Sequence, residues 1–186
     1  MPIIHEAYHL SMGKSELLRM MTNARNNFTV GLAGVLMLDL GNISDIRGKS
    51  SLVLGENYEL PFDQVVALLG EDYVDKLIAL TEFLNMLLRA FIKEPYELLK
   101  AYCRDTGQLR EMQCQPWFQF ARIIRNCLSH DFRFDLSKHM KLLPVTWKGK
   151  TITGGMHGTR LEHSFFGFND AIQLFEDLQS FANGLN

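Results

Sequence analysis

The chain has 186 residues, of which 47% are hydrophobic, so it can bury a core and its composition excludes a disordered protein. A formal net charge of −2 argues against a protein that coats nucleic acid over its whole surface. An odd number of cysteines (Cys103, Cys114 and Cys127) and a start without a long apolar run argue against a secreted protein, and we expect reduced core thiols in a cytoplasmic protein without a membrane segment.

The first predicted element is a helix from Ser15 to about Leu40. Gly31 and Gly34 inside it each disfavour a helix by about 1 kcal/mol relative to alanine. We therefore expect another helix to approach closely there, or the helix to break. Residues 44–60 show no clear period and are expected to be loop with short helical or extended pieces, and residues 61–70 form one short predicted helix.

Residues 72–103 give the strongest helical pattern, because leucines recur there at helical spacing. Pro95 inside this stretch either kinks the helix or ends it near Lys93, since proline cannot donate the helical hydrogen bond. Residues 108–115 are polar and expected to be partly helical. Pro116 then suits the first turn of the next helix.

That next helix, Trp117 to His130, is predicted to be amphipathic. At about 100° per residue, its polar side chains fall within an arc of roughly 140° that also includes Phe118. These polar residues are Gln119, Arg122, Arg125, Asn126, Ser129 and His130. The opposite side is apolar and should pack against the core. A solvated helix face usually mixes acids with lysines, and this one has neither.

The polar face of this helix suits an anion. Arginine favours two-pronged contacts with phosphate, and histidine can exchange a proton near neutral pH. Asn126 and His130 are four residues apart, as are Arg125 and Ser129, so each pair should be adjacent on the helix surface. We expect an anion held by Arg125 to lie beside a base at His130.

The pattern Arg125-Asn126-x-x-x-His130, on a late helix of a mostly helical chain, resembles the signature of HEPN-domain proteins. Many members of that superfamily are metal-independent ribonucleases of toxin–antitoxin, antiviral-defence and RNA-processing systems. The resemblance covers about residues 122–134. It implies an up-and-down helical bundle, catalytic roles for Arg125 and His130, a homodimer with a composite active site, and a possible antitoxin or regulatory partner. Phe132 stands where some family toxins carry a tyrosine that a partner enzyme modifies, so we do not expect that form of inactivation.

Beyond His130 the hydrophobic pattern no longer has the helical period. Residues 131–135 alternate as an extended segment would, and a β-hairpin is predicted at about 142–155. Gly154 to Gly158 is expected to be a hairpin tip or mobile flap. The last helix should run from Ala171 to Ala182, capped by Asn169 or Asp170. The predicted fold is one mainly α domain, residues 1–186, with a hairpin inserted before the last helix.

Charge is distributed unevenly along the chain. Residues 1–121 hold eleven of the 19 Lys and Arg residues and fifteen of the 21 acids. Residues 122–163 hold eight bases, three acids and four of the six histidines. This stretch is either a basic edge that binds a polyanion or a loop-rich region kept soluble by lysine.

The sequence predicts acid–base chemistry without a metal or cofactor. His5 and His9 are four apart but lie at a terminus expected to fray. In RNA, His130 would deprotonate the 2′-hydroxyl, which then attacks its own phosphate and leaves a 2′,3′-cyclic phosphate. Arg125 would stabilise the developing charge, and Asn126 would orient either group. Arg122, Ser129 and Arg133 are the predicted substrate-binding residues.

The alternative is a non-catalytic helical module that binds a protein or nucleic-acid partner. In that interpretation His130 would cap the helix C-terminus, where the helix dipole favours a cation. Arg125 would pair with an acid of the long helix, such as Glu82.

Overall fold

The computed structural model describes residues 12–39, 51–54, 58–61 and 73–186. The predicted helix over residues 62–70 and the pair His5 and His9 lie outside these ranges. Across the described residues, every helix is too short or too polar to cross a bilayer. The chain forms two compact units, a larger one of residues 1–25 with 89–186 and a smaller one of residues 26–88.

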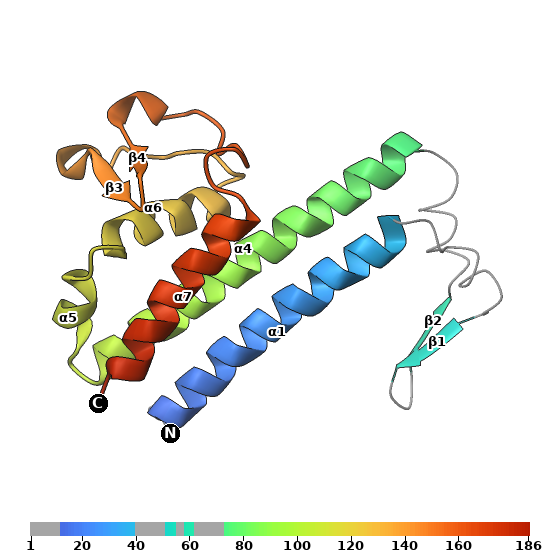
Figure 1. The fold of residues 1–186 in the computed structure, drawn as a ribbon, viewed down its shortest axis with the longest axis horizontal. Coiled ribbons are helices and arrows are strands. Elements are labelled where there is room, and N and C mark those ends of the chain that lie inside the picture. The colour runs from blue at the N-terminus through green and yellow to red at the C-terminus, as the bar shows by residue number, and fades with distance from the viewer. Residues whose placement is uncertain (1–11, 40–50, 55–57, 62–72) are drawn as a thin grey trace, which may run out of the picture. The chain divides into compact units, whose positions relative to one another are not determined.

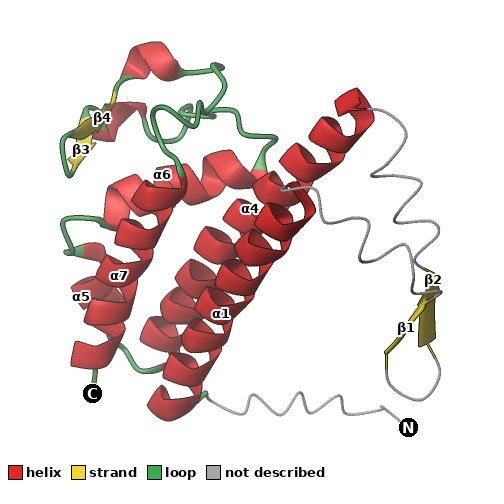
Figure 2. Ribbon diagram, turned by 45° about the vertical axis from the view of Figure 1, so that its right-hand side comes forward, coloured by secondary structure: helices red, strands yellow, loops and turns green. Residues whose placement is uncertain are grey.

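The fold is mainly helical, as predicted (Figures 1 and 2). The α-helices of the described residues are α1 (Lys14–Asp39), α4 (Tyr73–Asp105), α5 (Leu109–Gln113), α6 (Phe118–Ser129) and α7 (Phe168–Gly184). The strands pair as two antiparallel hairpins, β1 (Ser51–Leu54) with β2 (Tyr58–Pro61), and β3 (Val145–Trp147) with β4 (Lys150–Ile152). The second hairpin lies between the motif helix α6 and the last helix α7, which confirms the predicted order.

Helix α4 runs without interruption through Pro95. Of the two predicted alternatives, a helix end near Lys93 is therefore wrong. Pro95 has no N–H to offer the Phe91 carbonyl, so one helical hydrogen bond is lost. Burial of the side chains around it, with Phe91 2% and Tyr96 1% exposed, stabilises the helix across this gap. As a result, Tyr96 and Glu97 remain on a continuous helix that faces α6.

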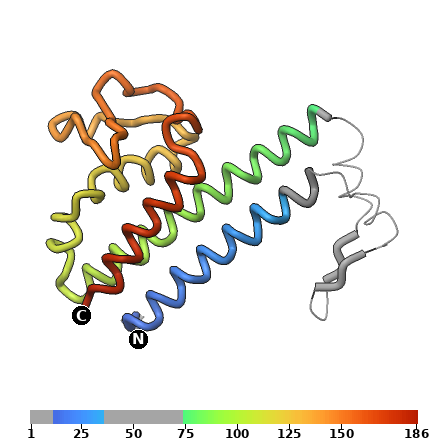
Figure 3. The backbone as a smooth tube through the Cα atoms, viewed as in Figure 1, coloured from blue at the N-terminus to red at the C-terminus, as the bar shows by residue number. Residues whose placement is uncertain are grey.

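The core of the larger unit joins α4, α7 and the start of α1. Phe91 of α4 stacks on Phe175 of α7 with ring centroids 4.8 Å apart, and the two helices run side by side (Figure 3). The Tyr102 hydroxyl donates to the carbonyl oxygen of Asn186 at 2.7 Å, and Lys14 Nζ donates to that of Leu185. These contacts fix the C-terminus between α1 and α4.

The β3–β4 hairpin packs on α6 and is bound to α7. Its turn residues Lys148 and Gly149 have φ of 42° and 81°, as a two-residue hairpin turn requires. Trp147 stacks on Phe120 of α6 at 5.0 Å. Asp177 of α7 accepts from Trp147 Nε1 at 2.7 Å and pairs with Lys148 at 3.0 Å. The hairpin is thus held by packing on the apolar face of α6 and by polar contacts with Asp177 of α7.

The segment that leaves α6 is extended after a tight turn. Asp131 and Phe132 have positive φ of 50° and 57°. Phe132 and Phe134 are buried and Arg133 between them is exposed, so the burial alternates as predicted, but Asp131 and Phe132 form a turn and are not extended. The Phe134 N–H donates to the Thr159 carbonyl at 3.0 Å, so the segment is held against the chain that follows the hairpin. Residues 154–156 there form a short 3₁₀ helix, which is neither a hairpin tip nor a flap.

In the smaller unit, the described parts of α1 and α4 pack closely. A Cβ on Gly31 would lie 2.6 Å from Leu87 Cδ1, so any larger residue would require the Leu87 side chain to shift. The predicted close contact is confirmed at Gly31, whereas a Cβ at Gly34 would meet open space. The β1–β2 hairpin was not predicted, and Pro61 ends its second strand instead of beginning a helix.

Several local predictions need correction. Helix α7 begins at Phe168, three residues early, and Asp170 accepts from the Gly167 N–H at 2.9 Å from inside the first turn. Ile172, which helical periodicity places on or near the packing stripe of α7, is 39% exposed. Cys114 is exposed, whereas Cys103 and Cys127 are buried as expected. Pro116 lies in the turn before α6, and Trp117 is the N-cap.

Candidate anion-binding site on helix α6

Helix α6 is amphipathic as predicted, but its polar face is not a solvated surface. The buried residues of α6 are Phe118, Phe120, Ala121, Ile123, Ile124, Cys127 and Leu128. Phe118, on the polar side of the helix, is buried because it packs on Tyr96 and Trp117. Arg122, Arg125, Asn126 and Ser129 are half-buried. Neighbouring elements therefore cover much of the polar face.

A pocket of about 360 Å³ opens over this face. Its walls come from three helices and from the loop that precedes β3. It is lined by Tyr96 and Lys100 of α4, Gln113 of α5, Phe118, Arg122, Arg125 and Asn126 of α6, and Lys138 and His139 of the loop. Four of these side chains are permanent cations and none is a carboxylate. The lining residues themselves therefore carry positive charge only, and this favours an anion as the ligand.

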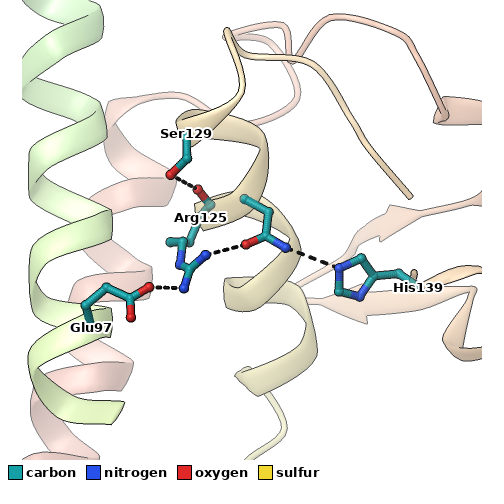
Figure 4. A network of polar contacts seen from close by, with 5 residues as sticks. Glu97, Arg125, Ser129 and His139 are labelled. Carbon is teal, nitrogen blue, oxygen red and sulfur yellow. Dashed lines mark hydrogen bonds and ion pairs between the residues drawn. The ribbon is translucent and has the colours of Figure 1, made fainter. Parts of the chain in front are cut away.

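Arg125 lines this pocket and has three neighbours, of which Figure 4 labels Glu97. Its guanidinium forms an ion pair with Glu97 of α4, donates to Asn126 Oδ1 at 2.5 Å, and lies 5.4 Å from the centre of the Tyr96 ring. An acid of the long helix pairs with Arg125, as the alternative interpretation expected, but this acid is Glu97 and not Glu82. Because the Glu97 side chain is 40% exposed, this pair contributes at most about 1 kcal/mol to stability.

Asn126 links Arg125 to His139. The amide Nδ2 of Asn126 lies 3.2 Å from His139 Nε2 (Figure 4). Since the guanidinium can only donate, the amide oxygen must face Arg125 and the amide nitrogen must face the imidazole. Nε2 of His139 is therefore the acceptor, and the ring proton is on Nδ1.

His139 is almost fully buried, with 2% of its surface exposed. Within the described residues its Nδ1 has no hydrogen-bond partner. A buried N–H without a partner costs about 1–3 kcal/mol, so such atoms are uncommon away from ligand sites. Among the residues that the structure describes, the buried Nε of Arg125, which lines the same pocket, also has no hydrogen-bond partner.

Burial and charge both keep His139 neutral. Burial lowers the pKa of this imidazole below 6.5, and the cation of Arg122 lowers that pKa further. Asp135 opposes this by raising the pKa, and Lys138 lowers it again. Burial also raises the pKa of Tyr96 to about 12, against the opposing effect of Arg125 and Arg122. The side chains of His139 and Tyr96 are therefore both uncharged at neutral pH.

His130 lies in a different environment. It is exposed at the C-cap of α6, where its N–H donates to the Cys127 carbonyl at 3.1 Å, and it does not line the pocket. Asp135 is close enough to be affected by it: hydrogen bonds from Ser137 lower the pKa of Asp135, and His157 and His130 lower it further. The imidazole of His130 is open to a ligand approaching from solvent.

The predicted site residues thus divide into two groups. Arg122, Arg125 and Asn126 are brought together in the pocket. Ser129 and Arg133 are not part of its lining: the Ser129 hydroxyl donates to the Arg125 carbonyl at 2.9 Å, and an Arg133 Nη1 donates to the Gly158 carbonyl at 3.2 Å.

Sequence reasoning missed His139, Lys138, Lys100 and Glu97. Their common feature is that they lie on α4 or in the loop before β3, outside the motif helix. For Lys138 and His139 the only sequence signal was their place in the basic, histidine-rich stretch. No helical period relates them to Arg125, so spacing could not identify them.

Cys127 and possible clusters of metal ligands bear on two other chemistries. Burial raises the pKa of Cys127 to about 12, and the thiol lies on the apolar face of α6, so it is not an activated nucleophile. Among the described residues, no group of three or more His, Cys, Asp or Glu side chains lies together in an arrangement that could hold a metal ion.

Comparison with known proteins gave no relative. No family model matches the chain, and no significant match was found among curated proteins or solved structures. The resemblance to HEPN-domain proteins therefore rests on the motif residues Arg125, Asn126 and His130 and on the helix that carries them.

Proposed function

We propose that this chain is a metal-independent endoribonuclease of the HEPN type, which binds RNA over the α6 pocket. The observation that carries the proposal is the lining of that pocket, where Lys100, Arg122, Arg125 and Lys138 converge without a carboxylate among them. Converging cations on one concave surface are what a polyanionic backbone needs. The pocket also contains Arg125, the cation of the motif.

The proposed reaction uses the 2′-hydroxyl of the RNA as nucleophile. His130 takes the hydroxyl proton, O2′ bonds to the adjacent phosphorus, and the bond from phosphorus to O5′ breaks. The products are a 2′,3′-cyclic phosphate and a 5′-hydroxyl. Arg125 stabilises the negative charge that develops on the phosphorane oxygens. His130 follows Asn126 by four residues, about 6 Å along the helix axis, so one RNA strand can span the pocket and the exposed imidazole.

The leaving O5′ needs a proton, and His130 alone does not act as base and acid at once. We propose that a homodimer brings a second His130 to the same strand, with water as the other source of the proton. An antitoxin or regulatory partner that covers this surface, and a role in antiviral defence, belong to the same proposal.

The test is cleavage of a short RNA by purified protein in the presence of a chelator. We expect wild type to release a fragment ending in a 2′,3′-cyclic phosphate, and a single 2′-deoxy substitution at the cleaved position to block the reaction. His130→Ala should abolish cleavage, whereas His163→Ala, which removes another exposed imidazole, should not. Equal cleavage by wild type and His130→Ala would identify a contaminating nuclease and reject the proposal.

A second candidate function has its own support. In the free chain Glu97 and Asn126 already occupy the guanidinium of Arg125, as expected of a structural ion pair in a non-catalytic binding module. Such a module would bind RNA or an acidic protein surface without changing it. Binding that persists with no cleavage by wild type at any concentration would favour this function.

A further inference from the structure

We propose that His139 is a ligand-binding residue of the α6 pocket, whose Nδ1–H donates a hydrogen bond to a phosphate oxygen of the bound ligand. This inference rests on the proposed function, which makes that phosphate part of an RNA strand. His139 is not part of the Arg125–His130 motif and lies nine residues after His130.

The direction of the donor follows from a chain of hydrogen bonds. Arg125 donates to Asn126 Oδ1, and this places the amide nitrogen 3.2 Å from His139 Nε2. Nε2 must then be unprotonated, so the neutral ring carries its proton on Nδ1. The His139 side chain is 2% exposed and belongs to the pocket lining. Its Nδ1 is buried and has no acceptor within the described residues.

The chemistry of the surroundings points to phosphate as the acceptor. Arg122 and Lys138 line the pocket together with His139, and Lys100 and Arg125 line it from α4 and α6. Donors therefore converge from three separate elements, which suits the tetrahedral arrangement of phosphate oxygens better than a planar carboxylate. A neutral imidazole adds a directional donor without further charge, and burial next to Arg122 keeps the pKa of His139 low enough for that state.

The test compares two substitutions that preserve different halves of the imidazole. Asparagine places an amide nitrogen near the position of Nδ1, whereas glutamine places an amide atom near the position of Nε2. If Nδ1 binds phosphate, His139→Asn retains the donor and His139→Gln loses it. If His139 acts only by positioning Asn126, the order is reversed.

The probes are inorganic phosphate and a hexaribonucleotide with 2′-O-methyl groups, which binds but cannot be cleaved. Affinity is measured by calorimetry. We expect wild type to bind both, His139→Asn to bind within about twofold of wild type, and His139→Gln to bind about tenfold more weakly, since one hydrogen bond to a charged group is lost. Thermal unfolding of each variant checks that the fold is intact.

A second measurement does not depend on any variant. In wild-type protein labelled with ¹⁵N-histidine, the Nδ1–H signal of His139 should shift when phosphate is added, and that of His163 should not. Equal affinity for all three proteins, stronger loss in His139→Asn than in His139→Gln, or an unchanged Nδ1–H signal would each overturn the inference.

The experiments give different results depending on whether the role of His139 or the proposed nuclease activity is wrong. If wild type cleaves RNA but His139→Gln binds the oligonucleotide normally, only the role of His139 is rejected. If wild type binds both probes with the predicted order of variants but never cleaves RNA, the nuclease is rejected and the phosphate site remains.

Discussion

The two ends of the Arg125–His130 motif lie on one helix but in different surroundings. Arg125 and Asn126 are half-buried and line the pocket. Arg125 forms an ion pair with Glu97, and Asn126 forms a hydrogen bond with His139. His130, one turn later, is exposed at the helix end. The difference arises because α4 and the loop before β3 cover only the first of these positions. The comparison suggests a division of roles, in which the covered end holds the phosphate and the open end performs the proton transfer.

The sharpest test of this division separates binding from cleavage. His130→Ala should lower the cleavage rate by about 10²–10⁴-fold, the usual effect of losing a general base, with no change in affinity for a 2′-O-methyl oligonucleotide. Arg125→Ala should impair both. Arg19→Ala, which removes an exposed arginine of α1, is the control. Weaker binding by His130→Ala would show that the two ends act as one unit.

The salt dependence of binding tests the cations of the covered end. If Lys138 neutralises one phosphate, Lys138→Gln should reduce the slope of log affinity against log salt by about 0.7, the value for single strands. Lys148→Gln should leave the slope unchanged, because Lys148 is paired with Asp177 and lines a separate hollow. The measurement is fluorescence anisotropy between 50 and 300 mM salt, roughly the range used for such titrations. An unchanged slope in Lys138→Gln would remove Lys138 from the site.

Glu97 should oppose ligand binding, since its carboxylate competes for the guanidinium of Arg125. Glu97→Gln removes that competition and should tighten oligonucleotide binding by up to about fivefold, consistent with the small strength of a partly exposed ion pair. Glu94→Gln makes the same change on an exposed residue of the same helix and serves as the control. Equal gains in both variants would show a general charge effect. A loss of affinity in Glu97→Gln would mean that the pair positions Arg125 instead of competing with the ligand.

The smallest expected effect is a pH dependence of stability. His139 has a lower pKa when folded than the usual 6.5, so below that pH the unfolded chain binds more protons. Its contribution to the free energy of unfolding is therefore complete above pH 6.5 and declines as pH falls towards the folded pKa. Denaturant unfolding of wild type between pH 5 and pH 8 should show this decline, and His139→Gln should reduce it. A steeper decline in the variant would mean that burial does not hold His139 neutral.

The helices and the second hairpin were predictable because their signals are local. Phe120 is buried on the apolar side that helical periodicity assigns to it, and strands β3 and β4 lie within the predicted hairpin range of about 142–155. Pro95 was ambiguous, since the burial that stabilises the helix around it comes from distant residues. The β1–β2 hairpin was missed because its sequence shows no clear alternation.

The candidate site was predictable only on the motif helix. Periodicity correctly grouped Arg122, Arg125 and Asn126, because these three share a helix face. Periodicity placed His130 beside these three residues as well. The spacing of residues along one helix does not show which of them other elements cover, and His130 is exposed outside the pocket lining. Glu97 and His139 come from other elements, and which of their atoms meet Arg125 and Asn126 depends on tertiary packing that one-dimensional spacing does not contain.

The loop between α6 and β3, which carries Lys138 and His139, is held in place by contacts at both of its ends. At its start, Phe134 is buried and bound to the chain at Thr159; at its end, Trp147 is fixed between Phe120 and Asp177. Most of the conformational entropy of this wall is therefore lost when the chain folds, not when a ligand arrives. The pocket is preorganised, and its affinity for a small anion will be governed mainly by charge and desolvation, with little rearrangement of the backbone.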